Sequence, residues 1–174
     1  MKQRTSFTIA PTMPDPSISA IVVTVSDSSH RGERADRSGP AVAAMLREGG
    51  FEVADVRVVP DDRDAIEREL VRACADARLV VTTGGTGIAA RDVTPEATLA
   101  ICDRTLPGVA ERMRAEGARS TPNAILSRAV CGTRGASLVL NLPGSPAAAT
   151  ESLGSVIAVL PHALDLLAGK TSHA

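Results

Sequence analysis

The chain has 174 residues, of which 19 are basic and 20 acidic, so that its formal net charge is −1. This length fits one domain with a well-buried core, and the balanced charge provides no basic field to collect nucleic acid. With two Phe, no Tyr and no Trp, the chain also lacks the aromatic surfaces on which single-stranded bases stack. The composition therefore predicts a single globular domain that does not bind nucleic acid.

Neither a membrane span nor a secretory signal is expected. Apolar residues make up 44% of the chain but come in short runs, far below the ~18 consecutive apolar residues of a membrane helix. Residues 1–17 are mostly polar and hold three prolines, which predicts a mobile tail ahead of one domain over residues 18–170. The three cysteines are an odd number without Cys-x-x-Cys spacing, so we expect buried, reduced thiols and a cytoplasmic protein.

Hydrophobic periodicity predicts strands that alternate with helices. Strands are expected over residues 18–26, 51–59, 79–83 and 136–142, with an irregularity at Asp55 and a polar loop from the first strand to Arg37. Helices are expected from Ser38 to Gly49-Gly50, from Asp61 or Asp62 to Ala77, near 94–103, 107–117 and 121–129, and from Ser145 onward with a break or bend at Pro161. This alternation is typical of a parallel sheet covered on both faces.

A short polar or glycine-rich motif directly follows each of the four predicted strands. The motifs are Ser26-Asp27-Ser28-Ser29, Pro60-Asp61-Asp62, Gly84-Gly85-Thr86-Gly87 and Pro143-Gly144-Ser145-Pro146. The carboxyl ends of parallel strands share one edge of the sheet, where ligands bind. Together the motifs predict a binding site at this edge, although each motif alone could be an ordinary turn. For residues 26–28 this alternative is a turn that starts no helix.

The third motif is the most informative, because it is followed by Arg91-Asp92-Val93-Thr94-Pro95-Glu96. Closely spaced glycines leave backbone N–H groups bare for a phosphate, and the helix start that Thr94 is expected to cap attracts anions. Asp92 would repel a phosphate, so we interpret it as the ligand of a divalent cation that phosphates bring with them. The alternative is a tight turn with a solvated Asp92.

These motifs resemble those of the molybdopterin-binding family, whose Mog and MoaB members handle the pterin of molybdenum cofactor. The resemblance rests on Gly84–Gly87, Arg91–Thr98, Val59–Asp62, Ile125–Arg128 and Leu140–Pro146, in the family's order over roughly residues 18–168. It implies a three-layer α/β/α sandwich with a mostly parallel sheet, commonly assembled as a trimer.

The resemblance also implies an activity, the Mg-ATP-dependent adenylylation of molybdopterin with release of pyrophosphate. Asp61 and Asp92 would be the catalytic residues and the Mg²⁺ ligands; a helix N-cap is the alternative for Asp61. Contacts to ATP and to the pterin phosphate are expected from Ser26, Asp27, Ser28, Ser38, Thr83, Gly84, Gly85, Thr86, Gly87, Thr94, Pro143, Gly144 and Ser145. Arg91, Arg128 and Arg134 are further phosphate candidates by charge alone.

Other functions fit the sequence less well or remain open. A Rossmann oxidoreductase would need Gly-x-Gly-x-x-Gly and a P-loop NTPase Gly-Lys-Ser/Thr, and neither pattern is present. The open alternative is a MoaB-like protein that binds the pterin without transferring adenylate. It is favoured by Ile88, where a proline often follows the glycine loop, and by the short segment after Pro146.

The predicted C-terminal helix has more apolar residues than one face can hold: Val156, Ile157, Val159, Leu160, Leu164, Leu166 and Leu167. A helix that is apolar on more than one face needs a second partner surface, which predicts an oligomer. The resemblance narrows this expectation to a homotrimer or a hexamer made of two trimers, with a molybdenum-insertion protein as a candidate partner.

Overall fold

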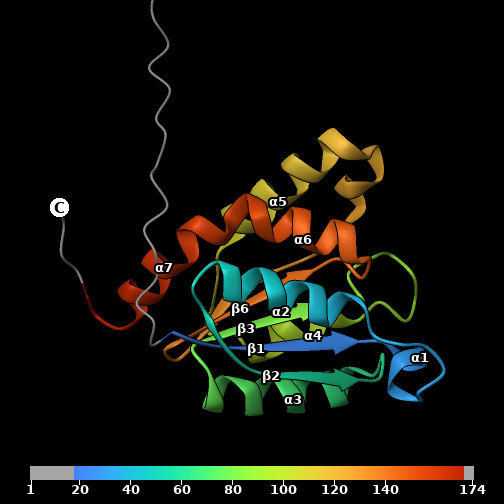
Figure 1. Ribbon diagram of the computed structural model, residues 1–174, viewed down its shortest axis with the longest axis horizontal. Helices are drawn as coiled ribbons and strands as arrows, with labels where there is room; N and C mark the ends of the chain where they lie inside the picture. Colours follow the sequence, from blue (N-terminus) through green and yellow to red (C-terminus); the bar gives the residue numbers. More distant parts are fainter. Residues whose placement is uncertain (1–17, 171–174) are drawn as a thin grey trace, which may run out of the picture.

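The computed structural model describes residues 18–170, which form one α/β sandwich (Figure 1). The predicted tail over residues 1–17 lies outside the described residues. The sheet of this part has six strands in the order β2-β1-β3-β6-β5-β4. The parallel strands are β1 (Ser19–Val25), β2 (Glu52–Val59), β3 (Leu79–Thr83) and β6 (Ser137–Leu142), and the antiparallel strands are β5 (Cys131–Arg134) and β4 (Arg104–Thr105).

Helices cover both faces of the sheet, as predicted (Figure 1). One face carries α2 (Ser38–Glu48), α5 (Pro107–Ser120), α6 (Pro146–Val156) and α7 (Leu160–Leu167), and the other carries α3 (Arg63–Asp76) and α4 (Thr94–Ile101). The remaining helices are α1 (Asp27–His30) and two 3-10 segments, η1 (Pro122–Leu126) and η2 (Ile157–Val159). The three-layer sandwich with a mostly parallel sheet is confirmed.

The core divides along the two-residue period of the strands. In β1, Ala20 and Val22 face the cluster that holds α2 and α6, whereas Ile21 and Val23 face the cluster that holds α3 and α4. All four side chains are at most 1% exposed, as expected for a parallel strand between two helical layers. The central strands are therefore fixed from both sides, which gives their carboxyl ends a rigid base.

The predicted strands and most of the predicted helices are present. The expected irregularity in β2 is also confirmed, because the pairing with β1 jumps from Val53 to Asp55 between Ala20 and Ile21. The helix expected over 121–129 is wrong in type and length: it is the 3-10 segment η1. The short strands β4 and β5 were not predicted. The C-terminal helix breaks at η2, just before Pro161. Pro161 therefore lies in the first turn of α7, where the backbone N–H that proline lacks has no partner within the helix.

The run from Pro146 to Leu167 is long and apolar enough to cross a membrane by length and composition alone. The structure uses it differently, since Leu153, Leu160 and Leu164 are fully buried in the core cluster of the sheet. η2 also interrupts the run. A helix that packs into the core of a protein can pass the same test of length and composition, so the run is weak evidence for a membrane span.

Candidate functional site

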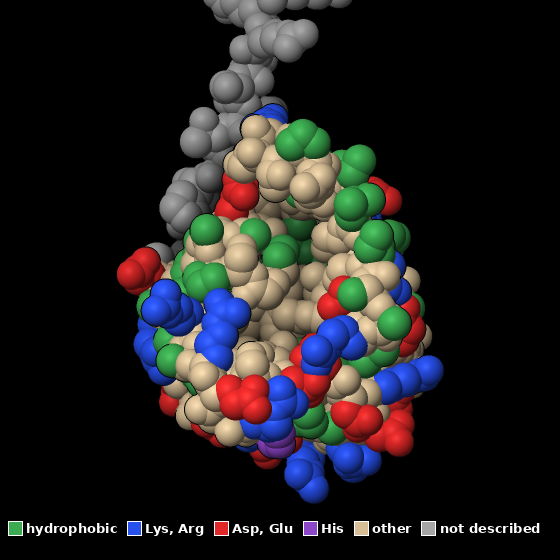
Figure 2. Space-filling model, turned by 90° about the vertical axis from the view of Figure 1, so that its right-hand side faces the viewer, with side chains coloured by type: hydrophobic (Ala, Val, Ile, Leu, Met, Phe, Trp, Pro, Cys, Tyr) green, Lys and Arg blue, Asp and Glu red, His purple; other side chains and the backbone are tan. Residues whose placement is uncertain are grey.

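The loops that follow β1, β2, β3 and β6 come together at the carboxyl edge of the sheet, as the sequence predicted. Together with the segment before α2 they surround a cavity of about 360 Å³. Predicted site residues that line it are Ser26, Ser38, Asp61, Thr83, Gly84, Gly85, Gly144 and Ser145. Figure 2 views the molecule from this side and shows a hollow with charged side chains below it and apolar side chains above.

Asp27 and Asp61 are joined by a reciprocal pair of hydrogen bonds. The Asp27 N–H donates to Oδ2 of Asp61 at 2.8 Å, and the Asp61 N–H donates to Oδ1 of Asp27 at 2.9 Å. This exchange ties the end of β1 to the end of β2. The N-cap alternative for Asp61 is therefore wrong, since Asp62 caps α3 by accepting from the Ala65 N–H at 2.8 Å.

Two further N-terminal caps differ from the expectation. Ser26 and Asp27 do not form a helix-less turn, because Ser26 caps the short helix α1 by accepting from the Ser29 N–H at 3.3 Å. Ser28 lies beside this cap, with its Oγ 3.2 Å from that of Ser26. Ser38 is the first residue of α2 and not its cap; the carboxylate of Asp36 accepts from the Gly39 N–H instead, at 3.0 Å.

The glycine loop depends on backbone conformations that favour glycine. Gly84 has φ +99°, and a Cβ there would lie 2.3 Å from the carbonyl oxygen of Val25. Gly85 has φ +64°, and its Cβ would lie 2.3 Å from Oγ1 of Thr94. Thr94 is fully buried and donates to the Gly84 carbonyl at 2.9 Å, so it supports the loop and neither caps α4 nor lines the cavity.

The loop after β6 lies against the glycine loop. Thr83 Oγ1 donates to the Pro143 carbonyl at 2.7 Å, and a Cβ on Gly144 would lie 3.3 Å from Cα of Gly84. Ser145 caps α6, as predicted, by accepting from the Ala148 N–H at 3.2 Å. The two loops therefore form one continuous wall.

Asp92 is held in a tight turn beside this wall. Its Oδ2 accepts from the Ala89 N–H at 2.9 Å, and a Cβ on Gly87 would come within 2.7 Å of the same oxygen. Arg128 fixes the turn from outside: its Nε donates to the Gly87 carbonyl at 2.7 Å, and it also pairs with Glu96. The absence of a side chain at Gly87 thus leaves space for the Asp92 carboxylate, and the Arg128 guanidinium is already bound to the glycine loop and to Glu96.

The other two candidate arginines have different surroundings. Arg91 pairs with Asp27 and, at 3.4 Å, with Oδ2 of Asp61, so it reaches the site. Arg134 donates to the Ile101 carbonyl at 2.8 Å and pairs in the sheet with the first residue of β6, at the opposite edge. Arg134 therefore does not belong to the site.

Electrostatics single out Asp61. Burial raises the pKa of its carboxyl, and the negative charge of Asp92 raises this pKa further. The Asp61 side chain is only 13% exposed. Removal from water and a second carboxylate both disfavour the charged form, so the pair makes a place where an added cation would be stabilised.

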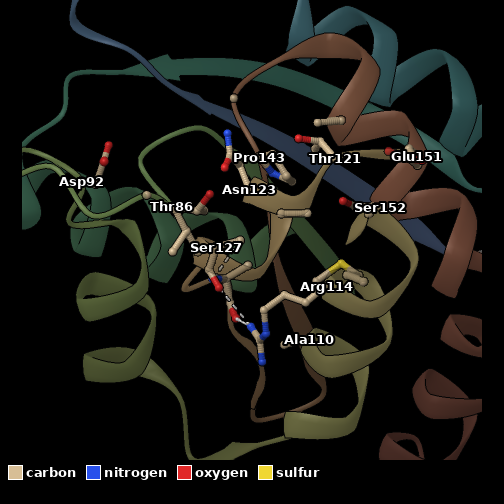
Figure 3. Close-up of a pocket in the computed structure, with 18 of the residues that line it drawn as sticks. Thr86, Asp92, Ala110, Arg114, Thr121, Asn123, Ser127, Pro143, Glu151 and Ser152 are labelled. Atoms are coloured by element: carbon tan, nitrogen blue, oxygen red, sulfur yellow. Dashed lines mark hydrogen bonds between the residues drawn. The ribbon is translucent and has the colours of Figure 1, made fainter. Parts of the chain in front are cut away.

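A second cavity, of about 510 Å³, lies on the other side of the glycine loop (Figure 3). Asp92 and Glu151 lie at opposite ends of it, and Arg114 of α5 donates to the carbonyls of Ser127 and Ala129 in its wall, at 3.3 Å each. The predicted residues that line it are Gly85, Thr86, Gly87, Asp92, Pro143 and Gly144. Sequence reasoning missed the lining from α5, η1 and α6, since its small and apolar residues look like ordinary core positions, and Arg114, Asn123 and Glu151 look like ordinary surface positions.

A mostly parallel α/β sandwich whose strand-end loops meet at one edge defines a class of proteins that bind ligands at that edge. Residues 21–162 match the family described as probable molybdopterin binding domain, and the chain belongs to this family.

Named relatives agree with this assignment. The chain is 42% identical over 152 residues to molybdopterin adenylyltransferase of Helicobacter pylori J99, a match covering 85% of this chain and 86% of that protein. It is 39% identical over 165 residues to molybdopterin adenylyltransferase of Escherichia coli K12, with 85% and 84% covered. The crystal structure of the molybdopterin biosynthesis enzyme MoaB from Thermus thermophilus superposes with a TM-score of 0.81 at 51% identity, covering 88% of this chain and 98% of that one.

Proposed function

We propose that this protein is a molybdopterin adenylyltransferase of molybdenum cofactor biosynthesis, which uses ATP and Mg²⁺. The relatives of that name, about 40% identical over most of the chain, support the activity. Among the residues, the main support is that Asp61, Asp92 and the glycine loop lie together at the carboxyl edge of the sheet, where they separate two cavities.

The reaction joins two phosphates. The terminal phosphate oxygen of molybdopterin attacks the α-phosphate of ATP, a new P–O bond forms, and the bond to pyrophosphate breaks. A phosphate monoester has its second pKa near ~6, so the attacking group is already mostly dianionic at neutral pH and needs no general base. The protein must instead align the two substrates and relieve the repulsion between their charges.

Backbone donors of the glycine loop suit the first part of this task. The Gly84 N–H is already engaged by the Leu142 carbonyl at 3.1 Å, so the candidate phosphate donors are the backbone N–H groups of Gly85, Thr86 and Gly87. Gly85 and Gly144 line both cavities. We place the reacting phosphates there, with one substrate in each cavity.

The carboxylates suit the second part. Mg²⁺ is usually held by one or two carboxylates together with substrate phosphates. Asp61 and Asp92 provide such a pair, and within residues 18–170 no cluster of three or more His, Cys, Asp or Glu side chains could hold a metal by itself. This fits a cation that arrives with ATP, where it would neutralise the phosphate charge.

Asparagine substitutions test the proposal directly. With molybdopterin and Mg·ATP as substrates, Asp92→Asn should lower pyrophosphate release by at least ~10²-fold, as expected when a charge-stabilising group of a few kcal/mol is lost. Asp61→Asn should act in the same direction, while pterin binding survives in both variants. Asp62→Asn is the matched control: it changes the adjacent carboxylate, and because Asn caps a helix about as well as Asp, both activity and stability should stay near normal. Near-normal activity of Asp92→Asn would refute the metal role.

A second candidate is pterin binding without adenylyl transfer. It is favoured by Ile88, which lines the larger cavity, is 70% exposed and stands where a proline often follows the glycine loop. Pterin binding by the wild-type protein with no pyrophosphate release would favour this candidate over the transferase.

The remaining parts of the proposal concern the setting of the reaction. We propose a cytoplasmic protein, supported by the free thiols of Cys74, Cys102 and Cys131, and a domain that spans residues 18–170. We also propose a homotrimer or a hexamer, supported by Val159 and Leu166, which remain about half exposed although they are large and apolar. A molybdenum-insertion protein would take up the adenylylated product.

A further inference from the structure

Arg91 pairs with Asp61, one of the two carboxylates that the proposed function assigns to the cation. Its guanidinium pairs with Oδ2 of Asp27 and lies 3.4 Å from Oδ2 of Asp61. The two carboxylates come from the ends of two different strands and are locked together by their backbone hydrogen bonds. Arg91 therefore neutralises Asp61, one of the two carboxylates that would hold the divalent cation, together with its neighbour Asp27.

The guanidinium can leave this position without disturbing the loop that carries it. The Arg91 side chain is 59% exposed, and exposed ion pairs are weak because water screens them. The neighbouring backbone is held independently, since the Asp92 N–H donates to the Ala89 carbonyl at 2.9 Å and the Asp92 carboxylate accepts from the Ala89 N–H. Movement of Arg91 therefore needs only a change of side-chain rotamer, while Asp92 stays in place.

We propose that Arg91 is an internal counter-ion, which neutralises Asp61, together with Asp27, until a nucleotide-bound divalent cation displaces it from Asp61. This inference rests on the proposed function. Arg91 and a divalent cation at the same carboxylate would repel each other, so Arg91 weakens the binding of a free divalent cation. A nucleotide phosphate offers the released guanidinium a bidentate partner, which offsets this loss. Binding of the cation and of the nucleotide then becomes mutually dependent, and the coupling must be equal in both directions.

This role makes Arg91 a positioning residue and predicts an effect that a purely structural role would not give. Removing its charge should strengthen the binding of a divalent cation in the absence of nucleotide. The probe is Mn²⁺, whose free concentration is measured by electron paramagnetic resonance, and the variant is Arg91→Gln. Because the two pairs it removes are exposed, we expect Mn²⁺ to bind about fivefold more tightly than to the wild type.

Arg31→Gln provides the matched control. Arg31 is as exposed as Arg91 and lies 3.9 Å from the same oxygen of Asp27, but its main partner is Glu33, at 2.7 Å. Arg31→Gln removes the same charge near the site but leaves the pairs of Arg91 intact, so it isolates the effect of general electrostatics. We expect this effect to change the Mn²⁺ affinity by no more than about twofold. Adding Asp61→Asn to Arg91→Gln should abolish the gain, because the gain requires the vacated carboxylate.

The same titrations with a non-hydrolysable ATP analogue separate the possible failures. The proposal expects the analogue to tighten Mn²⁺ binding in the wild type and to do so less in Arg91→Gln. If the analogue promotes Mn²⁺ binding but Arg91→Gln binds Mn²⁺ alone no better than the wild type, the Arg91 proposal is overturned and the proposed function stands. If neither protein binds Mn²⁺ even with the analogue, both proposals are overturned.

Discussion

Gly85→Ala tests whether the glycine loop owes its shape to close contacts or to backbone freedom alone. Gly85 has φ +64°, a region that L-residues enter at a cost of about 1–2 kcal/mol. Its Cβ would also lie 2.3 Å from Oγ1 of Thr94, a side chain that is fully buried and cannot swing into solvent. Alanine at position 85 therefore meets both a conformational cost and an overlap.

The overlap between the added Cβ and Oγ1 of Thr94 lowers the free energy of unfolding further than the unfavourable backbone conformation does by itself. If Thr94 turns away, its 2.9 Å hydrogen bond to the Gly84 carbonyl is lost, which costs about 1–2 kcal/mol for a buried group. The total destabilisation is then about 2–4 kcal/mol. For a chain of this size, that corresponds to a fall in Tm of about 5–12 °C.

The control is Gly135→Ala. Gly135 also has a positive φ, +53°, but a Cβ there meets nothing within 4 Å. This variant should lose only the conformational part, about 1–2 kcal/mol, in the same thermal and urea unfolding experiments. In a Thr94→Ala background, which removes Oγ1, Gly85→Ala should cost no more than Gly135→Ala. Equal destabilisation by the two alanines in the wild-type background would refute the close-contact argument.

Two further predictions concern alkaline pH and assembly. Burial raises the pKa of the Cys131 thiol to about 12 and those of Cys74 and Cys102 to about 11, from an ordinary 9.0. Between pH 9 and 11 the folded protein keeps thiol protons that the unfolded chain has lost, so the free energy of unfolding, measured by urea denaturation, should fall as pH rises through this range. The chain has no Tyr that would titrate in the same range. Replacing all three cysteines by alanine should therefore flatten this fall. Light scattering at micromolar concentration should give the mass of a trimer or hexamer, and introducing Asp at Val159 and Leu166 should lower it; a monomeric wild type would contradict the proposed assembly.

The position of the site was predictable because it follows from topology. Once the strands at 79–83 and 136–142 are recognised as parallel, their loops must meet at one edge, and the structure places Thr83 against Pro143 there. The details were not predictable, since they depend on contacts between distant segments. Thr94 was expected to cap its own helix but donates to Gly84. Asp61 lines the site, as one of its two expected roles required, but its lock to Asp27, 34 residues away, was not foreseen.

Elements that depend on partners rather than on their own pattern were missed. Strand β4 has two residues and β5 four, too few for a recognisable two-residue period. They form because β5 turns back onto β6 through Gly135, which has a positive φ, and because the Asp103 carboxylate accepts from the Gly135 N–H at 2.7 Å. The thiols were expected to be buried, but only Cys131 is fully so; Cys74 and Cys102 are partly exposed.

The two halves of the site are held in different ways, and this difference bears on how catalysis could be coupled to binding. The glycine loop is fixed by the core, through Thr94 and the neighbouring loop at Pro143. The carboxylates of Asp27 and Asp61 are fixed to each other, and the side chain of Arg91 links them to the turn that carries Asp92. If a divalent cation displaced this arginine, as proposed above, Asp61 and Asp92 would hold it, and the weak, exposed link through Arg91 would be lost. Ligand binding would then complete the site by exchanging one positive charge for another, while the backbone that aligns the phosphates stays unchanged.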